Sequence, residues 1–281
     1  MRLALIQMES AIGGLDGNIA RASRFIDEAA AGGAELLVLP EFWSTGYFPL
    51  AVDYSFYDLA DSDAGKATTA VRDKARQHGV HIASTIYERH GPGLFYNTSM
   101  MVSPKGEIVS KYRKVHVPAR RGLEKLFYRG GSKFPVAPVG EWRVGTMLCY
   151  DTLLPEPARC LALNGAELIL APFGASTTEG GIWEHMIITR AFENGAYVAA
   201  CNAVGELHLP DGDAFVLGGK SIIVDPEGGI VAEAPASGEM VVYGDLGLDQ
   251  VNEVRNRYFM FRDRRPDAYR VITADTEDIL G

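Results

Sequence analysis

The sequence is poor in cysteine and has no long apolar run. Its three cysteines, Cys149, Cys160 and Cys201, are too few, and odd in number, for a disulfide framework, so we expect a reducing compartment, the cytoplasm. No apolar run approaches the roughly 20 residues that span a bilayer, and the apolar start in MRLALIQMES is too short for a signal peptide. A glycosylation sequon at Asn97 is therefore interpreted as coincidental.

The sequence also lacks an excess of basic charge. A net charge of -9 and a pI near 5.2 argue against a nucleic-acid partner and favour a small molecule. The arginine-rich stretch 255–270 is accordingly interpreted as a solvated or interface segment. The six histidines show no HExxH or similar spacing, and no metal site is expected.

What the chain does contain is apolar residues at regular spacing. With 281 residues, 47% of them hydrophobic, it is long enough for one large globular domain. Apolar and β-branched runs bounded by Gly or Pro predict strands at 2–8, 35–40, 80–87, 98–104, 142–149, 167–172, 197–202 and 220–226. Helical spacing predicts helices at 18–31, 64–78, 155–164 and 182–194. The alternation predicts an α/β fold.

Two internal resemblances predict that the fold has two pseudo-symmetric halves. GAELLVLP at 33–40 recurs as GAELILAP at 165–172, and VSPKGEIV at 102–109 recurs as VDPEGGIV at 224–231. In each half a buried strand runs to a proline and a hairpin later turns on Pro-x-Gly. Because the two repeats occur in the same order, chance similarity between apolar strands is a weaker explanation.

The halves differ where strands end. Glu41 follows the first proline and Phe173 the second, while Lys114 follows the first hairpin and its counterpart is Ala236. Cys149 ends a further predicted strand. Ligand sites in α/β folds gather at the carboxyl ends of strands, and a buried carboxylate is costly unless it is paired or used. The three reactive side chains are therefore expected to meet.

Together these groups suit nucleophilic catalysis. A cysteine thiol has a pKa of roughly 8.5 and needs a neighbouring base to attack well at neutral pH. Burial makes a carboxylate a stronger base, which suits Glu41 to take the proton of Cys149. A protonated Lys114 can then donate to the oxygen that becomes negative when a carbonyl is attacked, with the backbone N–H of Tyr150 as second donor.

The motifs around these residues resemble the carbon-nitrogen hydrolase (nitrilase) superfamily over nearly the whole chain. They are LVLPEFWSTGY, SKYRKVHVP and GTMLCYDTLLPEPAR, in the family's order, with further matches in RAFENGAYVAACNAVG and FRDRRPDAY. The resemblance implies a four-layer αββα sandwich and a homodimer or higher homo-oligomer, with the tail 255–281 packing on a partner subunit. It also implies a Glu-Lys-Cys triad and no metal or organic cofactor. Glu124, in LEKLFYRGG, falls at a second glutamate that orients the substrate or the lysine.

The same resemblance implies an amidohydrolase that cleaves a small carboxamide or N-carbamoyl amine through a cysteine thioester and releases ammonia. Tyr150 and Asp151 resemble the amidase and carbamoylase branches, since nitrilases usually carry Trp-Glu there, so nitrile hydrolysis is the second choice. The segment 152–154 lacks the arginines that bind acidic substrates in some branches. An apolar or aromatic pocket is predicted, lined by Phe42, Trp43, Tyr47, Phe173 and Trp183.

Two other functions stay open at this point. One is a catalytically silent relative that binds a ligand, because enzyme folds also serve as binding proteins. The other is a glutaminase that feeds ammonia to a synthetase, which would have to be a separate partner chain.

Overall fold

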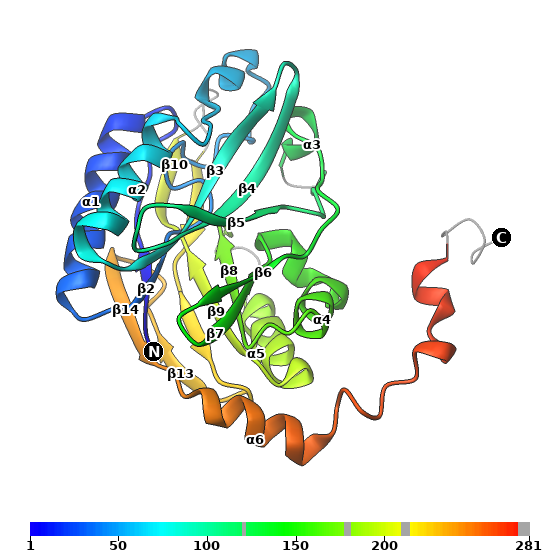
Figure 1. Cartoon of the computed structure of the whole chain (residues 1–281). Coiled ribbons are helices and arrows are strands. Elements are labelled where there is room, and N and C mark those ends of the chain that lie inside the picture. Colours follow the sequence, from blue (N-terminus) through cyan, green and yellow to red (C-terminus); the bar gives the residue numbers. More distant parts are fainter. Residues whose placement is uncertain (120–121, 177–180, 209–213, 275–281) are drawn as a thin grey trace.

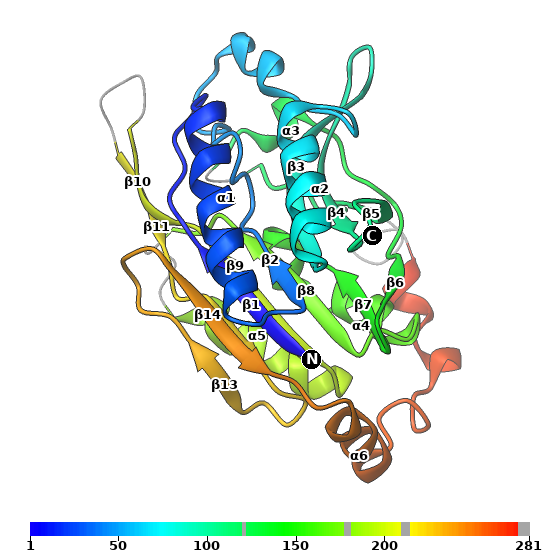
Figure 2. The same cartoon turned by 60° about the vertical axis from the view of Figure 1, so that its left-hand side comes forward.

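Two six-stranded sheets lie face to face, and helices cover their outer faces (Figure 1, Figure 2). The computed structural model describes residues 1–119, 122–176, 181–208 and 214–274. Within these ranges no helix combines the length and the apolar character that crossing a membrane requires. The arrangement is a four-layer αββα sandwich, as predicted.

The first sheet has the order β14-β1-β2-β3-β4-β5 and the second the order β13-β12-β9-β8-β7-β6. The strands of the first sheet are β1 (Arg2–Gln7), β2 (Leu36–Val38), β3 (His81–Gly91), β4 (Leu94–Val102), β5 (Ile108–Arg113) and β14 (Met240–Asp245). Those of the second are β6 (Val136–Val139), β7 (Trp142–Thr146), β8 (Leu168–Phe173), β9 (Tyr197–Asn202), β12 (Ile222–Val224) and β13 (Ile230–Glu233).

The two sheets share one topology, which confirms the predicted pseudo-symmetry. In the first, β1, β2 and β3 run parallel, β3–β4 and β4–β5 are antiparallel, and β14 pairs antiparallel with the outer side of β1. In the second, β7, β8 and β9 run parallel, β9–β12 and β12–β13 are antiparallel, and β6 pairs antiparallel with β7. The repeated octapeptides form β2 and β8 and the hairpins β4–β5 and β12–β13.

Alternating side chains on the strands build the layers. Along β1, Leu3 and Leu5 point into the core between the sheets, whereas Ala4 and Ile6 face the helices, as the two-residue period of a strand requires. Cys201 lies in the intersheet core, where its thiol contacts the carbonyls of Ile6 and Val38 at 3.3 Å. Its predicted role in packing fits this position.

Two helices cover each sheet. The helices α1 (Leu15–Ala31) and α2 (Lys66–His78) pack on the first sheet, and α4 (Pro155–Leu163) and α5 (Ile182–Asn194) pack on the second. Shorter elements lie outside this frame: the 3₁₀ helices η1 (Tyr54–Leu59) and η2 (Cys149–Leu153), the helix α3 (Glu124–Phe127), and the hairpin of β10 (Val204–His208) and β11 (Ala214–Gly218).

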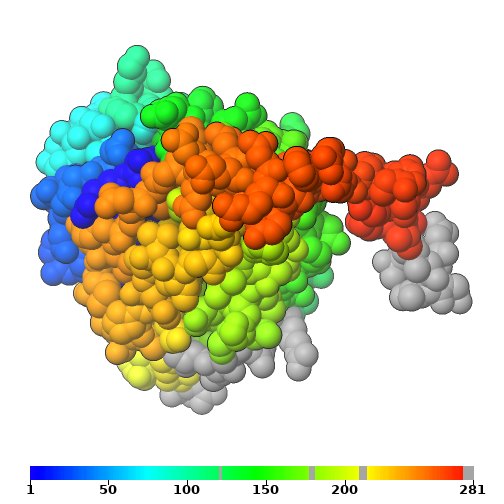
Figure 3. Space-filling view, turned by 90° about the horizontal axis from the view of Figure 1, so that it is seen from below, coloured from blue at the N-terminus to red at the C-terminus, as the bar shows by residue number. Residues whose placement is uncertain are grey.

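The C-terminal segment departs from the body of the molecule. After α6 (Leu248–Tyr258) the chain runs outward and forms only two short 3₁₀ helices, η4 (Pro266–Ala268) and η5 (Arg270–Thr273) (Figure 1, Figure 3). Much of its apolar surface is exposed, including Val271 and Ile272 at 57% and 59%. The last seven residues of the predicted tail, 275–281, lie outside the described residues.

Candidate active site

The turns after three strands converge on one place. Glu41 stands three residues after β2, Cys149 three residues after β7, and Lys114 directly after β5. The pseudo-symmetric positions Glu41 and Phe173 touch, since the Glu41 N–H donates to the Phe173 carbonyl at 3.2 Å. The predicted meeting of strand ends therefore takes place between the two sheets.

Lys114 lies between two buried carboxylates. Its Nζ donates to Oε1 of Glu41 at 2.9 Å and to Oε2 of Glu124 at 2.7 Å. The side chains of all three residues are fully buried. An ammonium group has three N–H donors, and two of them have described partners, so the third is left for another acceptor.

The charges in this cluster determine which groups are protonated. Burial alone would lower the pKa of Lys114, but the carboxylates of Glu124 and Glu41 raise that pKa well above its ordinary range. Burial raises the pKa of Glu124 to about 7, against the opposing effect of Lys114. Lys114 therefore remains a cation at neutral pH.

Glu124 is held by two tyrosines as well as by Lys114. The Tyr47 hydroxyl donates to Oε1 of Glu124 at 2.6 Å, and the Tyr128 hydroxyl donates to Oε2. Oε2 thus accepts from two donors, Lys114 and Tyr128, and has no lone pair left. Glu124 is better placed to anchor Lys114 than to act as a base.

Cys149 occupies a tight turn at the start of η2. Its φ is +44°, in the left-handed region that non-glycine residues rarely adopt. Burial raises the pKa of its thiol well above the ordinary value, and the Glu41 carboxylate raises it further. The thiol is therefore protonated at neutral pH, and attack by its sulfur requires a base to take the proton.

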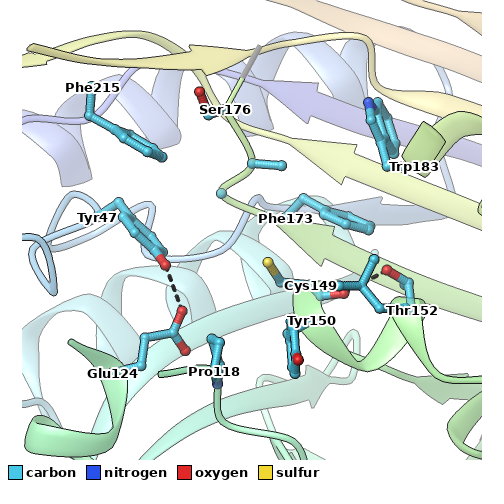
Figure 4. Close-up of a pocket in the computed structure, with 13 residues that line it drawn as sticks. Tyr47, Pro118, Glu124, Cys149, Tyr150, Thr152, Phe173, Ser176, Trp183 and Phe215 are labelled. Carbon is cyan, nitrogen blue, oxygen red and sulfur yellow. Dashed lines mark hydrogen bonds between the residues drawn. The ribbon is translucent and has the colours of Figure 1, made fainter. Parts of the chain in front are cut away.

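Cys149 opens onto a pocket of about 310 Å³ (Figure 4). Four of the six residues predicted to bind the substrate or the oxyanion line it together with Glu124: Tyr47, Tyr150, Phe173 and Trp183. Phe215, from the β10–β11 hairpin, stacks on Tyr47 with ring centroids 5.6 Å apart. The described lining residues include no Lys, Arg or His. The pocket is thus small, and its described wall contains five aromatic rings together with several polar side chains.

The prediction that Phe42 and Trp43 line this pocket is wrong for the described structure. Phe42 has a φ of +55°, which turns its ring into an aromatic cluster with Phe48 and Tyr128 behind the site. Trp43 packs beneath α1 and α2, and its indole Nε1 donates to Ser84 Oγ at 3.0 Å. Both are 1% exposed, because the turn after Glu41 directs them into the core.

Polar contacts that the sequence did not reveal hold the turn at Cys149. The buried Asp151 carboxylate accepts from the Leu148 N–H at 2.9 Å, from the Tyr112 hydroxyl, and from the His116 N–H at 3.0 Å. The His116 ring nitrogen Nδ1 lies 2.8 Å from the same carboxylate, and this hydrogen bond raises the pKa of His116. The position of Asp151, two residues after Cys149, was the available signal.

Arg190 contacts the same turn from the other side. Its guanidinium donates from Nε to the Thr152 carbonyl at 3.2 Å, and Arg190 lies in the RAFENGAYVAACNAVG motif on α5.

The described residues, those of the site included, contain no group of three or more His, Cys, Asp or Glu side chains that could hold a metal ion.

Known proteins resemble this chain over nearly its full length. The chain is 34% identical over 275 residues to a nitrilase from Pyrococcus abyssi, with 96% of this chain and 99% of the relative covered. It is 31% identical over 277 residues to the human omega-amidase NIT2, with 96% and 97% covered.

Two solved structures share the fold. A carbon-nitrogen hydrolase from Helicobacter pylori superposes with a TM-score of 0.92 at 25% identity, over 98% of both chains. A glutamate-to-glutamine variant of the amidase from Nesterenkonia sp. AN1 superposes with a TM-score of 0.83 at 26% identity, over 96% of this chain and 95% of that one. That structure shows the acetamide moiety of fluoroacetamide added covalently at the active site cysteine. The family model for carbon-nitrogen hydrolases matches residues 2–256, and the chain belongs to that family.

Proposed function

We propose that this protein is an amidase that hydrolyses a small, uncharged carboxamide through a thioester on Cys149. The observation that carries the proposal is the buried hydrogen-bonded cluster of Glu41, Lys114 and Glu124 at a pocket that is lined by the half-buried thiol of Cys149. Three ionisable groups without solvent are costly to maintain, and such clusters concentrate at catalytic sites.

Acylation begins with proton transfer from sulfur to Glu41. The sulfur of Cys149 then attacks the carbonyl carbon, and the carbonyl oxygen becomes negative. The third N–H of Lys114 and the backbone N–H of Tyr150 donate to this oxyanion. When the C–N bond breaks, Glu41 returns its proton to the leaving nitrogen, ammonia departs, and a thioester remains.

Deacylation repeats the steps with water in place of the thiol. Glu41 takes a proton from a water molecule, whose oxygen attacks the thioester carbon. The C–S bond breaks, the sulfur regains a proton from Glu41, and the carboxylic acid leaves. Side chains and water supply every proton in this cycle, and Glu41 ends it ionised as it began.

The pocket supports an uncharged acyl group. Its described wall includes the rings of Tyr47, Phe173, Trp183 and Phe215, the side chain of Leu153 and the carboxyl group of Glu124, and it has no Lys, Arg or His side chain to neutralise a carboxylate. A carboxylate transferred into such surroundings would lose its hydration without a partner. N-carbamoyl amines are neutral as well, and their cleavage by the same steps gives an amine, carbon dioxide and ammonia.

Nitrile hydrolysis is the second candidate, favoured by the similarity to the Pyrococcus nitrilase. Thiolate attack on a nitrile carbon gives a thioimidate, and water then converts it to the acid and ammonia. The Tyr150-Asp151 pair after the nucleophile still ranks amides first.

A panel of amides, N-carbamoyl amines, N-carbamoyl amino acids and nitriles tests the proposal through ammonia release. We expect release from neutral amides, loss of it in Cys149→Ala, and full activity in Cys160→Ala, a matched control whose half-buried thiol lies outside the pocket. Mass spectrometry of a quenched reaction should show the acyl adduct on Cys149. Equal release by wild type and Cys149→Ala would refute the thioester route, and no release from any compound would favour a silent binding protein.

We also propose that the chain forms a homodimer through the face of α4, α5 and the tail. Apolar side chains left exposed there support pairing: Leu163, Phe192, Tyr258, Phe259, Val271 and Ile272. Burying such a surface is favourable in proportion to its apolar area. Sedimentation equilibrium should give twice the chain mass of 30.5 kDa, and truncation after Tyr258 should weaken association. A concentration-independent monomer would contradict the pairing.

A further inference from the structure

Asn97, the residue of the apparent glycosylation sequon, lies directly beneath the candidate site. It stands on β4, opposite Tyr87 of β3, and none of its surface is exposed. In the folded chain it is therefore no acceptor for a glycan. Its side chain instead reaches the cluster, where Nδ2 donates to Oε1 of Glu41 at 2.7 Å.

The backbone of Asn97 contacts the second member of the cluster. Its carbonyl accepts the N–H of Lys114 at 2.9 Å, in continuation of the antiparallel β4–β5 pairing that joins Thr98 to Arg113. One residue thus holds Glu41 by its side chain and Lys114 by its main chain. The relative position of base and cation follows from the geometry of this strand.

The amide of Asn97 makes the two oxygens of Glu41 unequal. Oε1 accepts from both Asn97 and Lys114, whereas Oε2 is buried and has no hydrogen-bond partner among the described residues. Oε2 lies 3.4 Å from where a Cβ on Gly174 would stand, and Gly174 lines the pocket. The unpartnered oxygen therefore lies beside a residue of the pocket wall, and no described donor occupies its lone pairs.

The side chain of Asn97 makes no other hydrogen bond within the described structure. Its Oδ1 is buried without a partner there. A buried unpaired amide oxygen costs about 1–3 kcal/mol, so an asparagine at this position is poorly explained by stability. The donor to Glu41 is the one polar interaction that its side chain gains in return.

We propose that Asn97 is a positioning residue for Glu41. Its amide fixes the carboxylate with Oε1 turned to the two donors and Oε2 turned to Cys149. This inference rests on the proposed function, in which Glu41 is the base. A neutral donor suits the task, because a second cation in place of the amide would stabilise the ionised carboxylate and weaken it as a base.

Asn97→Asp and Asn97→Ala test this role. The first keeps the shape but replaces the donor with a like charge, and the second removes the amide. We expect kcat to fall about 100-fold with KM changed less than about threefold, since a misdirected reacting group can cost that factor. Losing a hydrogen bond to the ionised base favours its protonated form, so the acid limb of kcat/KM should move to higher pH, further in Asn97→Asp.

Thr98→Val is the matched control. It is buried on the same strand, and its hydroxyl donates at 2.7 Å to Glu88, outside the proposed catalytic cluster. We expect Thr98→Val to lose thermal stability, to keep kcat within twofold of wild type, and to leave the acid limb of kcat/KM at the same pH. If Asn97→Ala does not fold, Asn97→Ser, with a small side chain and no reach to Glu41, takes its place.

Three results would separate the possible failures. Asn97 variants with wild-type kcat and an unmoved acid limb, in a protein whose activity requires Cys149, would overturn the positioning role alone. Variants that lose activity only in proportion to folded protein, counted by thermal melts, would also overturn it. Wild type that is inactive on the whole panel, or active without Cys149, would refute the proposed function itself.

Discussion

Nζ of Lys114 lies 2.9 Å from Oε1 of Glu41, although 73 residues separate the two in the chain. Neither side chain touches solvent. Burying either charge alone would cost free energy, because the charge would lose its hydration. The opposite charge close by offsets part of that cost for both groups.

Replacing Glu41 with Gln should make Cys149 slow to react at neutral pH. The pKa of the thiol is raised well above its ordinary value, so little thiolate forms without a base. We expect alkylation by iodoacetamide at pH 7 to slow by about 100-fold or more, a factor typical of general bases. The rate in the variant should then rise about tenfold per pH unit, as the thiolate fraction does. Mass spectrometry of the Cys149 peptide over time measures this, and equal rates in both proteins would remove Glu41 as the base.

Replacing Lys114 with Met should destabilise the fold. It leaves Glu41 and Glu124 buried without their cation, and breaking a buried pair in this way costs about 3–5 kcal/mol. Adding Glu124→Gln removes one of the stranded charges and should recover part of the loss. Urea unfolding reports the stability of both variants. The proposed amide hydrolysis should stay at least about 100-fold below that of wild type in both variants, because each lacks the proposed oxyanion donor. Recovery of activity in the double variant would contradict that role.

Tyr47→Phe tests whether the hydroxyl supports Glu124. The ring keeps its stacking on Phe215, but Oε1 of Glu124 loses its donor at 2.6 Å. An acceptor left unpaired in the protein interior costs about 1–3 kcal/mol, and we expect kcat to fall about tenfold as Lys114 loses its firm anchor. Tyr54→Phe, at an exposed tyrosine of η1, should change neither the free energy of unfolding nor kcat. Unchanged kinetics in Tyr47→Phe would place Glu124 outside the catalytic cycle.

Because of Glu88, the free energy of unfolding should fall as the pH is lowered into the acid range. It is 2% exposed on β3, and although burial favours its neutral form, hydrogen bonds from Arg113, Thr98 and Lys111 lower its pKa from 4.5 to about 2. A carboxyl group with a depressed folded-state pKa stabilises the protein above pH 4.5, and this contribution is lost as the pH falls toward 2.

The difference in unfolding free energy between wild type and Glu88→Gln should therefore be about 3 kcal/mol at pH 7 and shrink below pH 4.5. Urea titrations from pH 3 to pH 7 measure it. Glu141→Gln, at an exposed position, should show a small difference at every pH. A constant difference for Glu88→Gln across the range would contradict the lowered pKa.

Local patterns in the sequence were enough for the frame of the molecule. Each of the eight predicted strand segments contains a strand, and the four predicted helices lie at α1, α2, α4 and α5. The octapeptide repeats indicated the matching halves. Buried apolar residues recur every two positions along a strand and every 3.6 along a helix. Strands and helices can therefore be predicted from residues that are close together in the sequence. No predicted strand segment covers β5, β6, β10, β11, β13 or β14, although the hairpin turns before β5 and β13 were predicted.

Side-chain direction at the site depended on the tertiary structure. The sequence by itself determined the fold class, placed Glu41, Lys114 and Cys149 at predicted strand ends, and named Glu124 through the family resemblance. Only the folded chain decided that Phe42 turns away from the pocket, because a backbone at positive φ reverses the direction that alternation would suggest. It alone brought Asn97 to Glu41, from a strand 56 residues later. Polarity patterns report burial, but the partner of a buried polar group is set by the packing of distant strands.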